Sequence, residues 1–169
     1  SMLNELNKYN FKNLVVWNRG VDTELFNPNK RDINSKDTQL TYVGRVAIEK
    51  NIEEFLKLKG NYNKIVVGDG PELEKYINKY PEVNFVGVKT GEELAKYYAN
   101  ADVFVFPSKT DTLGNVILEA LASGTPVAAY PVTGPIDVLT DEKINTLDND
   151  LLQSIKKALK VKRVDCRNF

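Results

Sequence analysis

The chain has 169 residues, which suits one domain with a buried core, and we expect residues 1–169 to form a single domain. It carries 23 basic and 23 acidic residues, so its net charge is zero and its composition gives no reason to expect nucleic acid as a partner. The absence of histidine excludes Ser-His-Asp and Cys-His catalysis, and histidine metal ligands, from this sequence.

Short apolar segments alternate with segments of helical periodicity along the whole chain. We expect strands at residues 15–17, 40–43, 64–67, 83–85, 103–106 and 126–129. We expect helices at residues 49–58, 71–79, 92–99, 115–123 and 151–159. This alternation predicts an α/β fold with a doubly wound parallel sheet, whose ligands bind at the carboxyl ends of the strands.

Three polar segments directly follow expected strands and should therefore share one edge of the sheet. They are Gly44-Arg45, Gly68-Asp69-Gly70 and residues 107–113. The second begins like the dinucleotide-binding pattern G-x-G-x-x-G, but Leu73 stands where the third glycine is needed. We expect both glycines to serve a tight turn, with Pro71 at the first helical position.

A pair of acids gives the strongest functional signal. Asp111 lies in the polar loop before helix 115–123, and Glu119 is the one charged residue inside that helix. A buried Glu119 needs partners, which two ribose hydroxyls or a nearby Arg or Lys would supply. The simpler alternative is that Glu119 faces solvent.

The start of the same helix predicts an anion site. Its first backbone N–H groups have no partner within the helix, and the helix dipole adds about half a positive charge there. A phosphate or diphosphate is therefore expected at Gly114, Asn115 and Val116.

Asp148-Asn149-Asp150 has the spacing of a D-x-D metal motif. These residues immediately precede helix 151–159, where Asp and Asn cap free N–H groups. Capping is the favoured interpretation, and we expect no metal and no cofactor.

The run TDTLGNVILEALASGTPV (residues 110–127) resembles the signature E-x-F-G-x-x-x-x-E-A-x-A-x-G-x-P-V of the retaining GT-B glycosyltransferases of family four. Asp111 replaces the first Glu of that signature, and Leu113 replaces the Phe. Four further blocks follow the family's order: NRGVDTELFNP (18–28), YVGRVAIEKNIEEFL (42–56), VVGDGPELEKY (66–76) and GEELAKYYANADVFVFPS (91–108). The variant in this chain is most similar to the branch with bacterial mannosyltransferases and sulfoquinovosyl-type lipid glycosyltransferases.

The resemblance implies two Rossmann-like domains in the complete enzyme, with donor and acceptor facing across a cleft. Every block found here corresponds to the second, donor-binding half, so we expect this chain to be that domain and the N-terminal acceptor domain to be absent. Ser1 and Met2 look like a remnant of cloning and are not expected to belong to the fold.

The resemblance also implies roles for two cations. Arg45 and Lys50 match the Arg and Lys of the family motif G-R-x-x-x-E-K, which reach the donor diphosphate. Fixed cations would stabilise the charge that develops on a departing diphosphate. Lys50 lies at the start of helix 49–58, where a solvated lysine is the ordinary alternative.

The remaining implied roles follow the chain. Gly44 lies at the phosphate edge, Val88 bonds the nucleobase through its backbone, and Asp111 bonds hexose hydroxyls. Thr112, Leu113 and Gly114 bring amides to sugar and phosphate, Asn115 and Val116 cap the diphosphate, and Glu119 holds the ribose. Because Asp111 is shorter than Glu by one methylene, the identity of the sugar stays open.

The resemblance implies the donor half of a retaining, metal-independent enzyme that moves a hexose from GDP-mannose or a UDP-sugar to a hydroxyl acceptor such as a lipid or polysaccharide. A nucleotide-sugar epimerase of the same architecture and a non-catalytic nucleotide-binding module remain alternatives. The expected partners are the nucleotide sugar and the absent domain, through which the full protein would touch a membrane. With a single cysteine, Cys166, and no signal-like N-terminus, the expected location is cytoplasmic.

Overall fold

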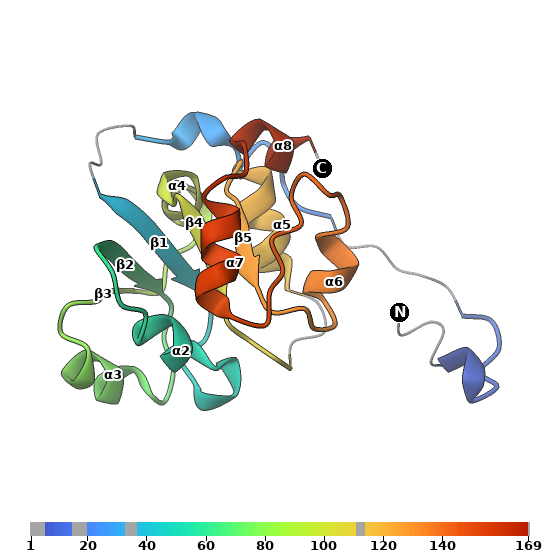
Figure 1. Ribbon diagram of the computed structural model, residues 1–169, viewed down its shortest axis with the longest axis horizontal. Helices are drawn as coiled ribbons and strands as arrows, with labels where there is room; N and C mark the ends of the chain where they lie inside the picture. The colour runs from blue at the N-terminus through green and yellow to red at the C-terminus, as the bar shows by residue number, and fades with distance from the viewer. Residues whose placement is uncertain (1–5, 15–19, 33–36, 111–113, 169) are drawn as a thin grey trace.

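The computed structural model describes residues 6–14, 20–32, 37–110 and 114–168. Its centre is a five-stranded, wholly parallel sheet in the order β3-β2-β1-β4-β5 (Figure 1). The strands are β1 (Thr38–Val43), β2 (Tyr62–Val67), β3 (Asn84–Gly87), β4 (Val103–Phe106) and β5 (Val127–Ala129). The predicted α/β doubly wound sheet, Rossmann-like in its layers, is confirmed.

Helices connect the strands and cover both faces of the sheet (Figure 1). They are η1 (Pro28–Lys30), η2 (Ile48–Lys50), α2 (Ile52–Leu56), α3 (Leu73–Lys79), α4 (Gly91–Asn100), α5 (Asn115–Ala122), α6 (Pro135–Val138), α7 (Leu151–Ala158) and α8 (Arg163–Arg167). Among the helices of the described residues, none is long and apolar enough to cross a membrane.

Strand β4 shows why two helical layers are needed. All four of its residues are buried, and they alternate between the two hydrophobic clusters. Val103 and Val105 join the cluster that includes α2 and α7, whereas Phe104 and Phe106 join the cluster that includes α4 and α5. Because successive side chains of a strand point to opposite faces, an unbroken apolar strand must be covered on both sides.

The strand order reverses between β1 and β4. From β1 the chain proceeds outward through β2 to β3, then returns to place β4 on the other side of β1 and continues to β5. β1 pairs with β2 over six residues but with β4 only at Leu40↔Val103 and Thr41↔Phe104. Loops that follow β1 and β4 therefore diverge at the carboxyl edge, which is the usual position of a ligand crevice.

The expected helix 49–58 is wrong as a single element. It divides into η2 and α2 at Asn51, whose φ of 52° is left-handed. Lys50 therefore ends the short η2 turn and does not begin the following α-helix. Apolar spacing at Ile52, Phe55 and Leu56 identified the buried face correctly but carried no information about the backbone reversal at Asn51.

The expected helix start at Pro71 is also wrong, because α3 begins at Leu73. The Glu72 N–H donates to the carbonyl oxygen of Val46 at 3.1 Å, and the Leu73 N–H donates to that of Gly70 at 3.1 Å. The chain before α3 thus forms a turn bound to the loop after β1. The expected strand 15–17 lies outside the described residues.

Candidate nucleotide site at the carboxyl edge of the sheet

A pocket of about 290 Å³ opens at the carboxyl ends of β1, β2 and β3. It brings together segments that are far apart in sequence but that all follow strands. Its lining consists of Val43, Gly44, Arg45, Val67, Gly68, Asp69, Val88 and Lys89. The expected grouping of the first two strand-following segments is confirmed, and the loop that contains Val88 joins them.

Glycine is required where these loops approach one another. A Cβ atom on Gly68 would overlap the carbonyl oxygen of Gly44, and one on Gly70 would overlap that of Val46. The Gly44 N–H donates to Val67 O at 3.0 Å, which continues the β1–β2 ladder into the loops. The predicted structural role of Gly68 and Gly70 is therefore confirmed, since any side chain would force the two loops apart.

Arg45 and Val88 both line this pocket. The Arg45 side chain is 63% exposed, and its guanidinium lies 3.5 Å from the Glu49 carboxylate, one turn along the chain. Its backbone carbonyl accepts a 2.7 Å hydrogen bond from the Tyr42 hydroxyl, which fixes the chain at the base of the side chain. Val88 is 65% exposed at the rim of the pocket. An exposed Arg45 can change partners at low cost, because surface ion pairs contribute little.

Lys50 is half-buried at the end of η2, next to Asn51. The side-chain amide of Asn51 donates to the carbonyl oxygen of Pro107 at 3.0 Å. The Thr110 hydroxyl donates to the carbonyl oxygen of Glu49 at 3.3 Å. These two bonds join the segment after β1, which carries both predicted cations, to the loop after β4, which leads to α5.

The expected anion site lies at the start of α5. Gly114 is the N-cap residue and provides no side-chain cap, whereas the Ile117 N–H already donates to Gly114 O at 3.0 Å. The amides that an anion would meet are therefore those of Asn115 and Val116. Asp111, Thr112 and Leu113 lie outside the described residues.

Glu119 lies one turn beyond Asn115 and is only partly exposed. Its Oε2 accepts a 2.8 Å hydrogen bond from the hydroxyl of Tyr98, a fully buried residue of α4. Burial raises the pKa of Glu119 above its ordinary value, and the bond from Tyr98 acts in the opposite direction. Burial, followed by the charge of Glu119, raises the pKa of Tyr98 well above its ordinary value. The structure thus gives Glu119 a partner that the sequence analysis did not consider, the phenol of Tyr98.

Tyr98 is the residue that the sequence interpretation missed, since the sequence analysis assigned it no role in the site. It lies on the inward face of α4 with Ala95 and Ala99, as core residues do. Its contact with Glu119 joins two helices that are separated by β4 in the chain. Nothing in a local pattern signals such a pairing.

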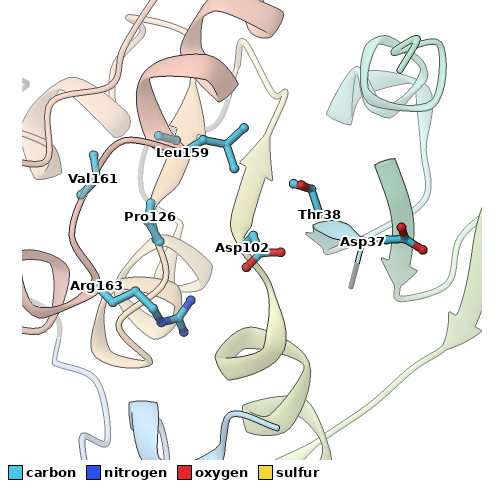
Figure 2. A pocket seen from close by; sticks show the side chains of 8 residues that line it. Asp37, Thr38, Asp102, Pro126, Leu159, Val161 and Arg163 are labelled. Atoms are coloured by element: carbon cyan, nitrogen blue, oxygen red, sulfur yellow. The ribbon is translucent and has the colours of Figure 1, made fainter. Parts of the chain in front are cut away.

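A second pocket, of about 310 Å³, lies at the opposite, amino edge of the sheet (Figure 2). Arg163 and Asp102 border it from different elements. Arg163 donates to the carbonyl oxygens of Ala101 at 2.8 Å, Ala99 at 2.7 Å and Ser123 at 3.1 Å. Burial, followed by the charge of Arg31, lowers the pKa of Arg163 to about 10. With its donors committed to the C-terminal ends of α4 and α5, Arg163 serves the fold.

Asp150 caps the start of α7, and Asp148 binds the backbone of Asp150. Asp150 Oδ1 accepts from the N–H groups of Leu152 at 2.8 Å and Gln153 at 3.4 Å, and Asp148 Oδ1 accepts from the Asp150 N–H at 3.0 Å. The predicted capping role is confirmed. Within the described ranges, no cluster of three or more Cys, Asp or Glu side chains could hold a metal ion.

The sequence of this chain is similar to those of known glycosyl transferases. The profile of the family described as Glycosyl transferases group 1 matches residues 24–164. A GDP-mannose-dependent alpha-mannosyltransferase from Corynebacterium glutamicum is 35% identical over 160 residues, which span 89% of this chain and 38% of the relative. The sulfoquinovosyl transferase SQD2 from Arabidopsis thaliana is 38% identical over 148 residues, spanning 77% of this chain and 28% of that protein. The chain thus spans well under half the length of these curated relatives.

Solved structures share the fold. Sucrose-phosphate synthase from Thermosynechococcus elongatus superposes with a TM-score of 0.69 and 28% identity, covering 88% of this chain and 43% of the synthase. The C-terminal domain of a group 1 glycosyl transferase protein (LpcC) from Francisella tularensis superposes with a TM-score of 0.64 and 19% identity, covering 88% of this chain and 97% of that domain. S. aureus TarM, crystallised with UDP among its ligands, reaches a TM-score of 0.72 at 19% identity, covering 98% of this chain and 36% of TarM.

Proposed function

This chain belongs to the group 1 glycosyl transferases, and from that membership we propose that it is the donor-binding domain of a retaining hexosyltransferase. The donor is a nucleoside-diphosphate hexose, and the acceptor is a hydroxyl group of a lipid or polysaccharide. The observation that carries this proposal is the carboxyl-edge pocket, joined through Asn51 and Thr110 to the loop that leads to α5 and Glu119.

The proposed diphosphate site combines the two predicted cations with the start of α5. Arg45 exchanges its exposed contact with Glu49 for the phosphates, Lys50 approaches from the end of η2, and the amides of Asn115 and Val116 bind the same anion. Loss of the nucleotide from the sugar leaves negative charge on the diphosphate. Fixed cations and helix-end amides stabilise that charge in the transition state, so the reaction needs no metal.

The rest of the donor follows from this placement. The ribose lies against Glu119, the base lies over the backbone at Val88, and Gly44 leaves room for the phosphates. Asp111 bonds the hexose, assisted by Thr112, Leu113 and Gly114. Departure of the diphosphate and attack by the acceptor take place on the same face of the sugar, so the anomeric configuration is retained. The leaving phosphate accepts the proton of the acceptor hydroxyl.

Two nucleotides are the first candidates as leaving groups. The Corynebacterium relative is a GDP-mannose-dependent enzyme by name, and TarM was crystallised with UDP. The acceptor site belongs to a separate domain, through which the full protein contacts a membrane surface in the cytoplasm. This chain alone therefore binds the nucleotide but transfers no sugar, because half of the catalytic cleft is missing.

Calorimetry with GDP, UDP, ADP and inorganic diphosphate tests the proposal. We expect at least one nucleoside diphosphate to bind, and Glu119→Ala to weaken it about tenfold, as expected when a charge-assisted hydrogen bond is lost, with little effect on inorganic diphosphate. Glu74→Ala, on the exposed surface of α3, is the matched control. Equal losses for the nucleotide and for inorganic diphosphate would remove the ribose role, and no binding of any nucleotide would refute the proposal.

A further inference from the structure

The Tyr98 hydroxyl is held in place by its surroundings. The Tyr98 ring meets Phe26 edge-on at a centroid distance of 5.7 Å and Phe104 at 5.5 Å. The carbonyl oxygen of Tyr98 accepts a 2.6 Å hydrogen bond from the buried Thr125 hydroxyl. With its ring and its backbone both held in place, Tyr98 donates its O–H to Glu119 Oε2 at 2.8 Å.

The chemistry of this pair leaves Glu119 able to bind more. A carboxylate has two oxygens and about four acceptor positions, whereas a phenol supplies a single proton. An arginine in place of Tyr98 would engage both oxygens and neutralise the charge. Tyr98 instead fixes Oε2 and leaves both the negative charge and the acceptor capacity of Oε1 for another donor.

We propose that Tyr98 is a positioning residue, which orients the Glu119 carboxylate so that it accepts from the vicinal hydroxyls of a nucleotide ribose and thereby selects ribose over 2′-deoxyribose. This inference rests on the proposed function, because it assigns the selectivity of the same site. Burial of Glu119 supports this inference. Desolvation raises the pKa of the Glu119 carboxyl group, which means that its ionised form is destabilised. Further hydrogen-bond donors, such as ribose hydroxyls, would offset that destabilisation.

Tyr98→Phe is the decisive variant, because it retains the ring and removes the hydroxyl. The probes are UDP and GDP, their 2′-deoxy counterparts and inorganic diphosphate, measured by calorimetry on this 169-residue chain. We expect the variant to bind the ribonucleotide about 5- to 10-fold more weakly, as for the loss of one hydrogen bond to a charged group. The 2′-deoxynucleotide, which keeps only the 3′-hydroxyl, should be weakened less, and inorganic diphosphate should bind as it does to the wild type. Tyr97→Phe, the adjacent residue of α4, is the matched control and should change none of these affinities.

A double-mutant cycle separates positioning from a general effect on structure. If Tyr98 acts through Glu119, then Tyr98→Phe should have no further effect on ribose selectivity in a Glu119→Ala background. Unchanged selectivity in Tyr98→Phe alone would overturn the inference. So would an equal additional loss in the Glu119→Ala background.

The failures of the two proposals are distinguishable. If the wild-type chain binds nucleoside diphosphates without discriminating against 2′-deoxyribose, the ribose role of Glu119 fails and the role of Tyr98 fails with it. If Glu119→Ala abolishes discrimination while Tyr98→Phe retains it, only the role of Tyr98 fails. Should Tyr98→Phe not fold, proton NMR of the wild-type chain gives the answer. The chemical shift of the Tyr98 hydroxyl proton should change when UDP or GDP is added but not when inorganic diphosphate is added. No change on addition of the nucleotide would overturn the inference.

Discussion

The Asn51 side-chain amide donates to the carbonyl oxygen of Pro107 at 3.0 Å, and this bond connects the loops that follow β1 and β4 where the strand order reverses. Asn51 also has a left-handed backbone, with a φ of 52°. One residue therefore ends the η2 turn, begins α2 and links the two sides of the crevice.

Two substitutions of Asn51 separate these duties. Asn51→Gly retains the left-handed backbone and removes the bond to Pro107, so we expect a loss of about 1 kcal/mol in the free energy of unfolding. Compared with Asn51→Gly, Asn51→Ala places a Cβ atom on the left-handed backbone, and we expect it to lose about 1 kcal/mol more. Urea denaturation measures both. Equal stability of the two variants would show that the backbone conformation imposes no cost.

Gly68→Ala tests the close contact between the loops after β1 and β2. Its Cβ would overlap the Gly44 carbonyl oxygen, and its φ of +142° disfavours any side chain. We expect a loss of at least about 3 kcal/mol in unfolding free energy, together with weaker nucleotide binding. Gly20→Ala is the control, since a Cβ on Gly20 meets nothing within 4 Å, and it should change stability by less than about 0.5 kcal/mol. A Gly68→Ala variant as stable as the control would contradict the packing described here.

Glu119→Gln should stabilise the fold and weaken ligand binding. Burial raises the pKa of Glu119 in the folded chain, so the folded state binds a proton more readily than the unfolded state does. Ionisation of Glu119 therefore does not reduce the free energy of unfolding at a pH below the pKa of Glu119 in the unfolded chain. The reduction develops as the pH rises from the unfolded pKa to the folded pKa, and it is complete above the folded pKa. The Gln variant avoids this cost and still accepts from Tyr98.

The measurement is thermal unfolding of wild type and Glu119→Gln across a pH series. At pH 7 we expect the variant to be more stable by about 1 kcal/mol, or about 2–4 °C in Tm. Below about pH 4, where Glu119 is protonated in both states, the two proteins should unfold at the same temperature. An advantage that does not change with pH would mean that ionisation of Glu119 is not its source.

Arg163 is expected to protect Cys166. Burial raises the pKa of the Cys166 thiol to about 12, so the folded chain should react slowly with thiol reagents. Arg163→Met removes the bonds from Arg163 to the carbonyl oxygens of Ala99, Ala101 and Ser123, of which Ala99 and Ala101 keep their bonds from Arg31. The loss should cost about 2 kcal/mol and raise the labelling rate of Cys166 about 30-fold through more frequent opening. Lys160→Met, at an exposed position nearby, is the control. Equal labelling rates in the two variants would separate Cys166 from the Arg163 contacts.

The parts of the fold that follow from local patterns were predictable. The apolar run of β4 was identified to the residue, because a strand buried on both faces contains no polar position. Alternation of strands and helices determined the parallel sheet, and the glycines at 68 and 70 indicated the tight loops. The Asp150 cap was legible because its partners follow it directly in the chain.

What could not be predicted depends on contacts between distant segments. The break at Asn51 is stabilised by Pro107, 56 residues later, and the late start of α3 reflects a bond to Val46. The Tyr98–Glu119 bond joins two helices that only the folded sheet brings together. For the candidate site, the sequence indicated which loops meet and where the acid lies, but not which side chain orients it. The roles predicted for the site residues stay predictions, and Asp111, Thr112 and Leu113 lie outside the described residues.

Helix α8 is hydrogen-bonded to the two helices that carry the proposed ribose site. Arg163 donates hydrogen bonds to carbonyl oxygens at the C-terminal ends of α4 and α5. Arg167 donates to the carbonyl oxygen of Ala122 at 2.7 Å and to that of Phe26 at 3.0 Å. Tyr98 belongs to α4 and Glu119 to α5. A shift of α8 relative to the sheet would therefore displace both partners of the Tyr98–Glu119 bond together, and we expect it to change the affinity of the proposed ribose site.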